Sequence, residues 1–280
     1  MNDQGLHARH PAFDATILAM GLLFSAALAG LALGGDWYAG FIPVQAASSV
    51  LPGWLWESLT TLGDGRVQLA LMLPFCLRYP RVFWALVVGA LLAGMMSRGL
   101  KVWFELPRPA AVLAASQITI LGARMTSLSF PSGHTVSAFS FVVAWLALLG
   151  WWRALPIVTL AALAGFSRIA VGAHWPVDVL AGALIGLVGG WAGLRLSRHF
   201  RWGLGIGPHW ALVSIAVIAV ATLPFDGQGY PDTQPWRIVA CAWGLGGFAL
   251  RYLLPLLRGG WQAASRPLAG IAAEHHSTEP

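Results

Sequence analysis

The sequence predicts an all-α integral membrane protein, built as a polytopic bundle of helices, and three observations support that prediction. Apolar residue types make up 57% of the 280 residues and charged types only 10%, against about 25% charged residues in a soluble domain. The mean hydropathy is +0.68. Apolar runs of spanning length recur along the whole chain. With only Cys76 and Cys241 as cysteines, this composition excludes a disordered chain, a disulfide scaffold and an ordinary soluble enzyme.

Eight apolar runs are long enough to be candidate spans. The first, 15–34, follows Arg9, so a signal peptide is the alternative. Its apolar region of about 20 residues exceeds the ~7–15 of a cleaved signal, which favours an uncleaved anchor. The second, 59–77, is the weakest, because Asp64 and Arg66 interrupt it near one end. Six further runs complete the set: 82–100, 134–150, 154–173, 177–194, 208–224 and 237–256.

The distribution of basic residues predicts the topology. With the N-terminus inside and the spans alternating, the inner segments hold ten basic and four acidic residues, and the outer segments hold seven of each. Basic residues keep short loops on the cytoplasmic side, and the arginine-rich stretch 194–201 follows this rule most strongly. We therefore expect segments 1–14 and 257–280 to be cytoplasmic. The isoelectric point of about 10.1 then reflects membrane topology, and we expect no nucleic-acid partner.

The membrane region divides into a core and an addition. The core, 15–194, holds six spans, and the addition, 195–256, holds an arginine-rich inner loop and two more spans. Small residues recur at four-residue spacing in the sixth span, at Gly182, Gly186 and Gly190. This spacing predicts that a neighbouring helix approaches closely there, and we assign it no chemistry.

Polar residues gather at matching ends of four spans. Lys101 follows the third span, and Arg108 lies seven residues later. The sequence SFPSGHT (129–135) opens the fourth span, SRIAVGAH (167–174) closes the fifth and WPVD (175–178) opens the sixth. Because successive spans cross the membrane in opposite directions, these four ends share the outer membrane face. They lie away from the hydrocarbon core, where charge is costly. The residues expected to converge are therefore Lys101, Arg108, Ser132, His134, Arg168, His174 and Asp178.

These residue types suit phosphoryl transfer. The three cations among them could neutralise a phosphate and its developing charge. Gly133 falls where a helix begins, so free backbone N–H groups and close approach together favour an anion. Asp178 beside His174 would fix one ring nitrogen and leave the other to attack, while His134 could protonate a leaving oxygen. Singly, each residue has a plain structural explanation, such as a snorkelling arginine or a carboxylate at a helix N-terminus.

Together the motifs resemble a known family. The pattern Lys101-x6-Arg108-Pro109, Pro131-Ser132-Gly133-His134 and Ser167-Arg168-x5-His174-x3-Asp178 is similar to the three-part signature of the type 2 phosphatidic acid phosphatase (PAP2) superfamily. The resemblance implies a phosphatase that uses no metal and no cofactor and forms a phosphohistidine. It implies His174 as nucleophile, Asp178 as its orienting carboxylate and His134 as general acid. It assigns phosphate binding to Lys101, Arg108, Ser132, Gly133 and Arg168, and it leaves Ser167 without a definite role.

The same resemblance implies a lipid phosphate substrate reached from the bilayer, at the periplasmic face of a bacterial inner membrane. We rank undecaprenyl diphosphate first, followed by phosphatidylglycerol phosphate, phosphatidate and lipid A. A lipid-to-lipid phosphotransferase with the same site is one alternative. A transporter of anionic lipids is another, although transporters place ionisable groups near the bilayer midplane. The sequence assigns no oligomeric state and no role to the two additional spans.

Other segments carry open expectations. The stretch 110–128 is either a lid over the site or a plain connection. Asp64 and Arg66 form a turn that opens a helix, or they also frame the cleft. We expect Asp226 and Asp232 in a solvated outer loop, with contact to a lipid headgroup as the alternative. We expect His199 and His209 at a solvated interface.

Overall fold

The computed structural model describes residues 11–34, 36–227 and 229–259. The regular elements among these residues are helices, with no β-strand. The predicted cytoplasmic ends therefore lie largely outside the described residues, and their sidedness stays a prediction. In chain order the α-helices are α1 (Pro11–Leu33), α2 (Phe41–Ser48), α3 (Gly53–Leu62), α4 (Gly65–Met72), α5 (Pro80–Phe104), α6 (Pro109–Val112), α7 (Gly133–Leu149), α8 (Trp151–Ala170), α9 (Pro176–His199), α10 (Ile206–Ala221), α11 (Gln234–Cys241) and α12 (Leu254–Gly259).

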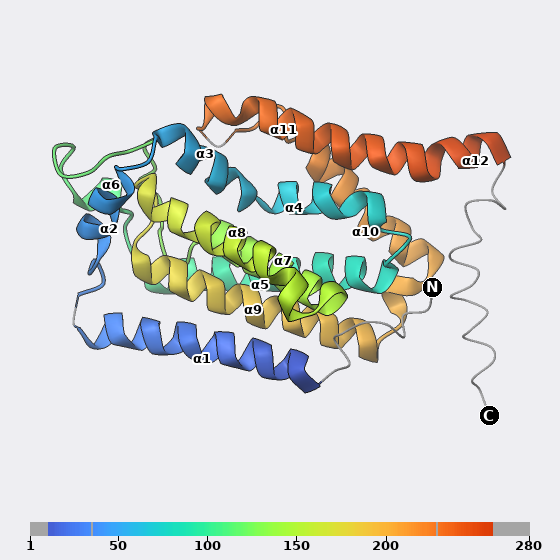
Figure 1. Cartoon of the computed structure of the whole chain (residues 1–280), viewed down its shortest axis with the longest axis horizontal. Helices are drawn as coiled ribbons and strands as arrows, with labels where there is room; N and C mark the ends of the chain where they lie inside the picture. The colour runs from blue at the N-terminus through green and yellow to red at the C-terminus, as the bar shows by residue number, and fades with distance from the viewer. Residues whose placement is uncertain (1–10, 35, 228, 260–280) are drawn as a thin grey trace.

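The all-helical, membrane-type architecture agrees with the prediction. Helices α1, α5, α8 and α9 are each long and apolar enough to cross a membrane, whereas α7 and α10 are apolar but shorter. Six of the eight predicted runs coincide with single helices. The run 237–256 is continuous from α11 to α12 through two π-helical stretches, Ala242–Gly246 and Ala249–Leu253. In Figure 1, α1 lies along one edge of the molecule and α11–α12 along the opposite edge.

The predicted span 59–77 is not one helix. It is divided into α3 and α4 at Gly63–Asp64. The side chain of Asp64 caps α4 by accepting a hydrogen bond from the backbone N–H of Arg66 at 2.9 Å, which satisfies one of the free donors at a helix start. The predicted turn before a charged helix N-terminus is therefore confirmed, while the expectation of one continuous span is wrong.

Helix α9 lies at the centre of the bundle between α5 and α7, and its glycines allow the close packing. A Cβ at Gly190 would lie 2.9 Å from the Ser140 carbonyl oxygen of α7. On another face of α9, a Cβ at Gly189 would meet Gly89 and Ala93 of α5. The predicted close packing on small residues is confirmed. The glycines of α9 allow both α5 and α7 to approach closely. Because α5, α7 and α9 are held this closely, their ends are placed together.

The added C-terminal helices pack on the broken span. Helices α10 and α11 contact α4, and a Cβ at Gly244 would lie 2.9 Å from the Cα of Ala70. The hydroxyl of Tyr252 donates to the Pro74 carbonyl at 3.0 Å. Figure 1 shows α11 running beside α3 and α4. The addition is thus packed against the six-span core rather than set apart from it.

The expectation of a solvated His209 is wrong. Its side chain is fully buried, and its ring lies 5.9 Å from that of Phe83, measured between centroids. The short turn Trp202–Leu204 folds back against Trp84 of α5. This turn brings the start of α10, and His209 with it, into the bundle.

Gly190→Ala tests the close packing of α9. The added methyl would overpack the α7 contact, and overpacking typically costs about 1–3 kcal/mol. We expect the thermal unfolding midpoint in detergent to fall by several degrees. Gly21→Ala on α1, where a Cβ would meet nothing within 4 Å, is the matched control and should leave the midpoint unchanged or slightly raised. Equal midpoints for wild type and Gly190→Ala would contradict the packing.

Candidate active site

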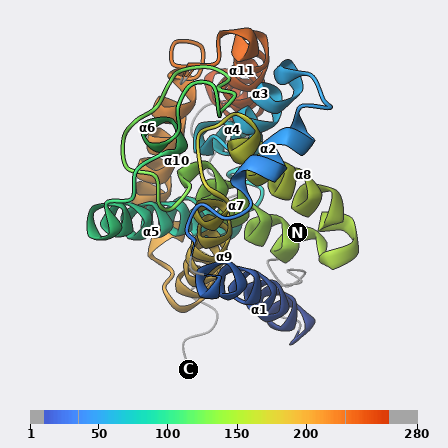
Figure 2. The same ribbon diagram turned by 90° about the vertical axis from the view of Figure 1, so that its left-hand side faces the viewer.

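The predicted site residues lie around one end of the bundle, where α5 ends, α7 begins and α8 turns into α9. Figure 2 views the molecule from this end, with α2 and α6 beside the connecting segments. Most of the predicted polar residues there are buried, including Arg108, Ser132, Arg168, His174 and Asp178.

His174 and Asp178 form the centre of the site. Proline at the first position of α9 fits the fixed φ of a helix start and places Asp178 in the first turn. The Nδ1 atom of His174 lies 3.1 Å from Oδ2 of Asp178. The same oxygen accepts the backbone N–H of Trp175 at 2.9 Å and a short hydrogen bond from the Ser129 hydroxyl. A carboxylate held in this way fixes the imidazole tautomer and leaves Nε2 with its lone pair.

Arg108 faces the free nitrogen of that histidine. Its Nη1 lies 3.2 Å from Nε2 of His174 and donates to the Ala173 carbonyl at 3.0 Å. Its Nε is buried and has no hydrogen-bond partner among the described residues. Buried donors are normally paired, so the unpaired Nε of a guanidinium whose Nη1 contacts His174 indicates a place for an anion.

Arg168 is held from two sides. Its side chain is 1% exposed. Its Nη1 donates to the Thr60 hydroxyl at 2.6 Å and to the Tyr230 hydroxyl at 3.1 Å. Its buried Nε, like that of Arg108, lacks a partner within the described part of the chain. Two guanidinium groups therefore each keep a buried donor unused in this region.

Lys101 is fixed to the segment that precedes α7. Its Nζ donates to the carbonyls of Ser129 at 2.9 Å and Pro131 at 2.8 Å, with a longer contact to Leu128 at 3.3 Å. The lysine thus holds the backbone that carries the second motif. The single lysine of the chain thus lies beside the second motif, and its binding of phosphate stays a prediction.

The start of α7 is tied to α9 and open at Gly133. The backbone N–H of Ser132 donates to the Asp178 carbonyl at 3.0 Å, and the Ser132 hydroxyl accepts from Thr135 at 3.0 Å. A Cβ at Gly133 would meet no atom within 4 Å. An N-terminus with open space in front of it is suited to an anion.

His134 lines a cavity of about 280 Å³ between α4, α5 and α7. A Cβ at Gly63, at the break between α3 and α4, would lie 2.9 Å from the Cβ of His134. Asp64 also lines this cavity, so the helix break frames the cleft as well as forming a turn. The cavity wall around His134 also includes Gly65, Ser97, Arg98, Lys101, Gly133 and Ser137.

Ser167 is placed away from these contacts. It is fully buried, and its hydroxyl donates to the Ala164 carbonyl of its own helix at 2.7 Å. Within the described residues, no group of three or more His, Cys, Asp or Glu side chains lies close enough to hold a metal ion. The absence of a metal requirement stays a prediction.

Segment 110–128 packs beside the site. The amide of Gln45 on α2 pairs with the backbone of Thr119, at 2.8 and 2.9 Å. The N–H of Leu121 donates to the Val171 carbonyl at 3.2 Å, and Met125 contacts Arg108. The segment is thus anchored to α2 and to the α8–α9 turn, and whether it moves as a lid stays a prediction.

Sequence reasoning missed three contacts of the site. Ser129 lies two residues before the second motif, and its hydroxyl donates to the Asp178 carboxylate. Thr60 and Tyr230 lie in α3 and in the α10–α11 connection, 108 and 62 residues from Arg168. No local pattern announces contacts over such separations.

The environment of His174 favours its neutral form. Burial and the cations Arg108, Arg168 and Lys101 hold the pKa of His174 well below its usual value of 6.5, against the single carboxylate of Asp178. Burial and Arg168 lower the pKa of the Arg108 guanidinium to about 10, which leaves it charged at neutral pH. The site therefore combines a histidine that favours its neutral form with the charged guanidinium of Arg108.

The chain matches a family model described as the PAP2 superfamily over residues 82–202, a range that contains all three motifs. The family whose model this segment matches is therefore the one that the motifs resemble.

Among its relatives, the undecaprenyl-diphosphatase BcrC of Bacillus subtilis is 38% identical over 36% of this chain and 49% of that protein. A lipid A 1-phosphatase of Porphyromonas gingivalis is 38% identical over 25% of this chain and 16% of that protein. The chain thus spans about half or less of the length of these relatives. The crystal structure of Aquifex aeolicus LpxE aligns with a TM-score of 0.47 and 29% identity, covering 51% of this chain and 85% of that one.

The direction of the His174 pKa shift predicts where kcat/KM falls on the acidic side of its pH profile. If neutral His174 is required, its lowered pKa keeps the neutral form present at lower pH, so the limb of kcat/KM should lie below pH 6.5. Arg108→Gln removes a cation that lowers this pKa, and should therefore move the limb upward as well as reduce kcat/KM. Both proteins share the ionisation of the substrate, so the shift between their profiles is the readout. A limb at the same pH in both would contradict the electrostatic role of Arg108.

Proposed function

We propose that this chain is an integral membrane lipid phosphatase that works through a phosphohistidine at His174. The observation that carries the proposal is the geometry around that ring. Its Nδ1 contacts the Asp178 carboxylate at 3.1 Å, while its Nε2 faces the Arg108 guanidinium at 3.2 Å. A neutral imidazole oriented by a carboxylate and set among anion-binding groups is the arrangement that nucleophilic attack on phosphorus needs.

In the first step the Nε2 lone pair of His174 attacks the phosphorus atom. A P–N bond forms as the P–O bond to the lipid breaks, and His134 gives a proton to the leaving oxygen. Lys101, Arg108, Arg168 and the α7 N-terminus with Ser132 and Gly133 bind the phosphoryl oxygens. In the second step water attacks phosphorus and gives its proton to His134. The P–N bond then breaks, inorganic phosphate leaves and neutral His174 is restored.

The position of the cleft supports a lipid substrate. The cavity beside His134 is bounded by α4, α5 and α7, and it extends along α5 from Lys101 to Ala90. At about 1.5 Å per residue this stretch of helix is roughly 16 Å long, enough for a headgroup and the start of a lipid chain. A lipid entering sideways from the bilayer would bring its phosphate to the helix ends.

Undecaprenyl diphosphate is the first-ranked substrate, because recycling of that carrier needs an outward-facing phosphatase and because one relative is named for it. Lipid A is next among candidates, supported by the name of a second relative. Phosphatidylglycerol phosphate and phosphatidate are further candidates, because each is a membrane lipid with a terminal phosphate. The distribution of arginines supports a periplasmic site and cytoplasmic ends.

Transfer of the phosphoryl group to a second lipid is the alternative for the same site, since a phosphohistidine can react with a hydroxyl other than water. Labelled phosphate on an added acceptor lipid would favour it. Transport of an anionic lipid has less support, because the charged cluster lies at one end of the helices rather than at mid-depth.

Phosphate release from a lipid panel tests the proposal. The purified full-length chain in detergent, with EDTA present, should release phosphate from undecaprenyl diphosphate faster than from phosphatidylglycerol phosphate, phosphatidate or lipid A. His174→Ala should reduce the rate of phosphate release on the order of 10³-fold or more, because removal of a catalytic nucleophile lowers kcat by that much. His199→Ala removes an exposed histidine at the other end of α9 and should keep full activity.

Retained activity in His174→Ala would contradict the assignment of the nucleophile. Loss of all activity with EDTA, restored by a divalent cation, would contradict the metal-independent mechanism.

A further inference from the structure

The connection between α10 and α11 belongs to the C-terminal addition, yet it contacts the candidate site. It carries Tyr230, whose side chain is 3% exposed. The Tyr230 hydroxyl accepts a hydrogen bond from Nη1 of Arg168 at 3.1 Å, and the Arg168 guanidinium carbon lies 5.9 Å from the centre of the Tyr230 ring. A residue outside the matched family domain therefore touches a predicted phosphate ligand.

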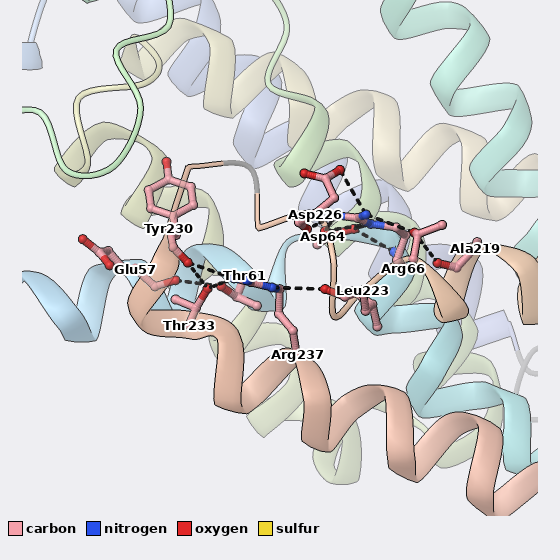
Figure 3. A network of polar contacts seen from close by, with 11 residues as sticks. Glu57, Thr61, Asp64, Arg66, Ala219, Leu223, Asp226, Tyr230, Thr233 and Arg237 are labelled. Carbon is pink, nitrogen blue, oxygen red and sulfur yellow. Dashed lines mark hydrogen bonds and ion pairs between the residues drawn. The ribbon is translucent and has the colours of Figure 1, made fainter.

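The backbone of this connection is held by Arg237 of α11, as Figure 3 shows. The buried Arg237 guanidinium donates to the carbonyl of Leu223 at 3.2 Å and to that of Tyr230 at 2.8 Å, and it also bonds the Thr233 hydroxyl. Hydrogen bonds from a charged donor are stronger than neutral ones. Arg237 thus links Leu223, near the start of the connection, to Tyr230 and Thr233, near its end, and so fixes the position of Tyr230.

A second tie joins the connection to the broken span. Arg66 of α4 contacts the Asp226 carboxylate at 3.2 Å and the Asp226 carbonyl at 3.0 Å. The same guanidinium pairs with Asp64 at 2.6 Å, and Figure 3 shows the three residues together. Asp226 was expected in a solvated loop, and it is exposed but paired. Because Asp64 lines the cavity of His134, the connection is linked to both sides of the site.

The ring of Tyr230 is locked by close packing. A Cβ at Gly122, where φ is +77°, would lie 2.6 Å from Cε1 of Tyr230. The ring also packs in a cluster with Trp56 of α3 and Val171 and Ala173 of the α8–α9 turn. Ala173 directly precedes His174, so the tyrosine lies against the turn that carries the nucleophile.

We propose that Tyr230 is a positioning residue for Arg168, and that the two additional helices complete the phosphate site by presenting it. This inference rests on the proposed function. With Nη1 fixed by the hydroxyls of Thr60 and Tyr230, the planar guanidinium has a set orientation, and its buried Nε remains a donor for a phosphoryl oxygen. A pre-oriented side chain loses less rotamer entropy when the anion binds.

Tyr230→Phe tests this role, because it removes one hydroxyl and keeps the ring that packs on Gly122. The probe is sodium orthovanadate, whose binding to the purified full-length chain is followed by tryptophan fluorescence. We expect Tyr230→Phe to bind orthovanadate on the order of tenfold more weakly, the scale of one hydrogen bond to a charged group. Its unfolding midpoint should stay close to that of wild type. In turnover with the best lipid of the panel, kcat should fall more than KM rises.

A double-mutant cycle separates positioning from a general structural effect. In an Arg168→Gln background, the further change Tyr230→Phe should alter orthovanadate binding by less than about twofold, because the guanidinium that it positions is absent. Tyr252→Phe is the matched control, since it removes another tyrosine hydroxyl, bonded to Pro74, from the addition. It should leave orthovanadate binding unchanged.

The outcomes are distinct. Equal orthovanadate affinity in wild type and Tyr230→Phe, or an equal loss in both backgrounds, would overturn the role of Tyr230 while leaving the proposed function in place. Failure of wild type to bind orthovanadate at all would contradict the phosphate site itself, and with it both proposals.

Discussion

The gathering of three cations around His174, of which Arg108 and Arg168 are buried and Lys101 is half-buried, is the constraint on which the rest of this structure depends. Arg108, Arg168 and Lys101 all influence the His174 ring, and Asp178 is the carboxylate hydrogen-bonded to it. Removing like charges from water in one place is unfavourable unless partners compensate. Part of the compensation is visible: carbonyls surround Lys101, hydroxyls hold Nη1 of Arg168, and a carbonyl accepts from Arg108. The Nε atoms of Arg108 and Arg168 have no hydrogen-bond partner among the described residues, so part of the positive charge is not compensated. An anion bound there would compensate it, and the proposed phosphoryl substrate is such an anion.

The fold meets this constraint through close helix packing. Glycines on two faces of α9 bring α5 and α7 near enough for their ends to meet. The contact between the Ser132 N–H and the Asp178 carbonyl then joins the second motif to the third at 3.0 Å. A side chain that separated α7 from α9 would move the N–H groups at the start of α7 away from His174, the proposed nucleophile. In this sense the small residues far from the chemistry set its geometry, although they take no part in it.

Much of this arrangement could be predicted from the sequence because it is local. Hydrophobic periodicity predicts where the helices end, and the alternation of the spans places His174, Asp178 and the nearby cations at one face. The structure brings His174 and Asp178 into contact. What could not be predicted depends on long-range packing. The burial of His209 follows from a turn that folds back on α5, and the division of 59–77 follows from a cap at Asp64 that also faces the cavity. The contact of Tyr230 with Arg168 joins the addition to the core across 62 residues, and no motif encodes it.

The most direct test of the account is to trap the phosphorylated enzyme. Full-length protein is mixed with a lipid diphosphate labelled on its terminal phosphate, quenched within one turnover in alkali, where phosphohistidine survives, and digested for mass spectrometry. We expect label on the peptide that carries His174, lost on acid treatment and absent from His174→Ala. Label on any other residue, or release of phosphate within the first turnover with no labelled protein at any time point, would contradict it.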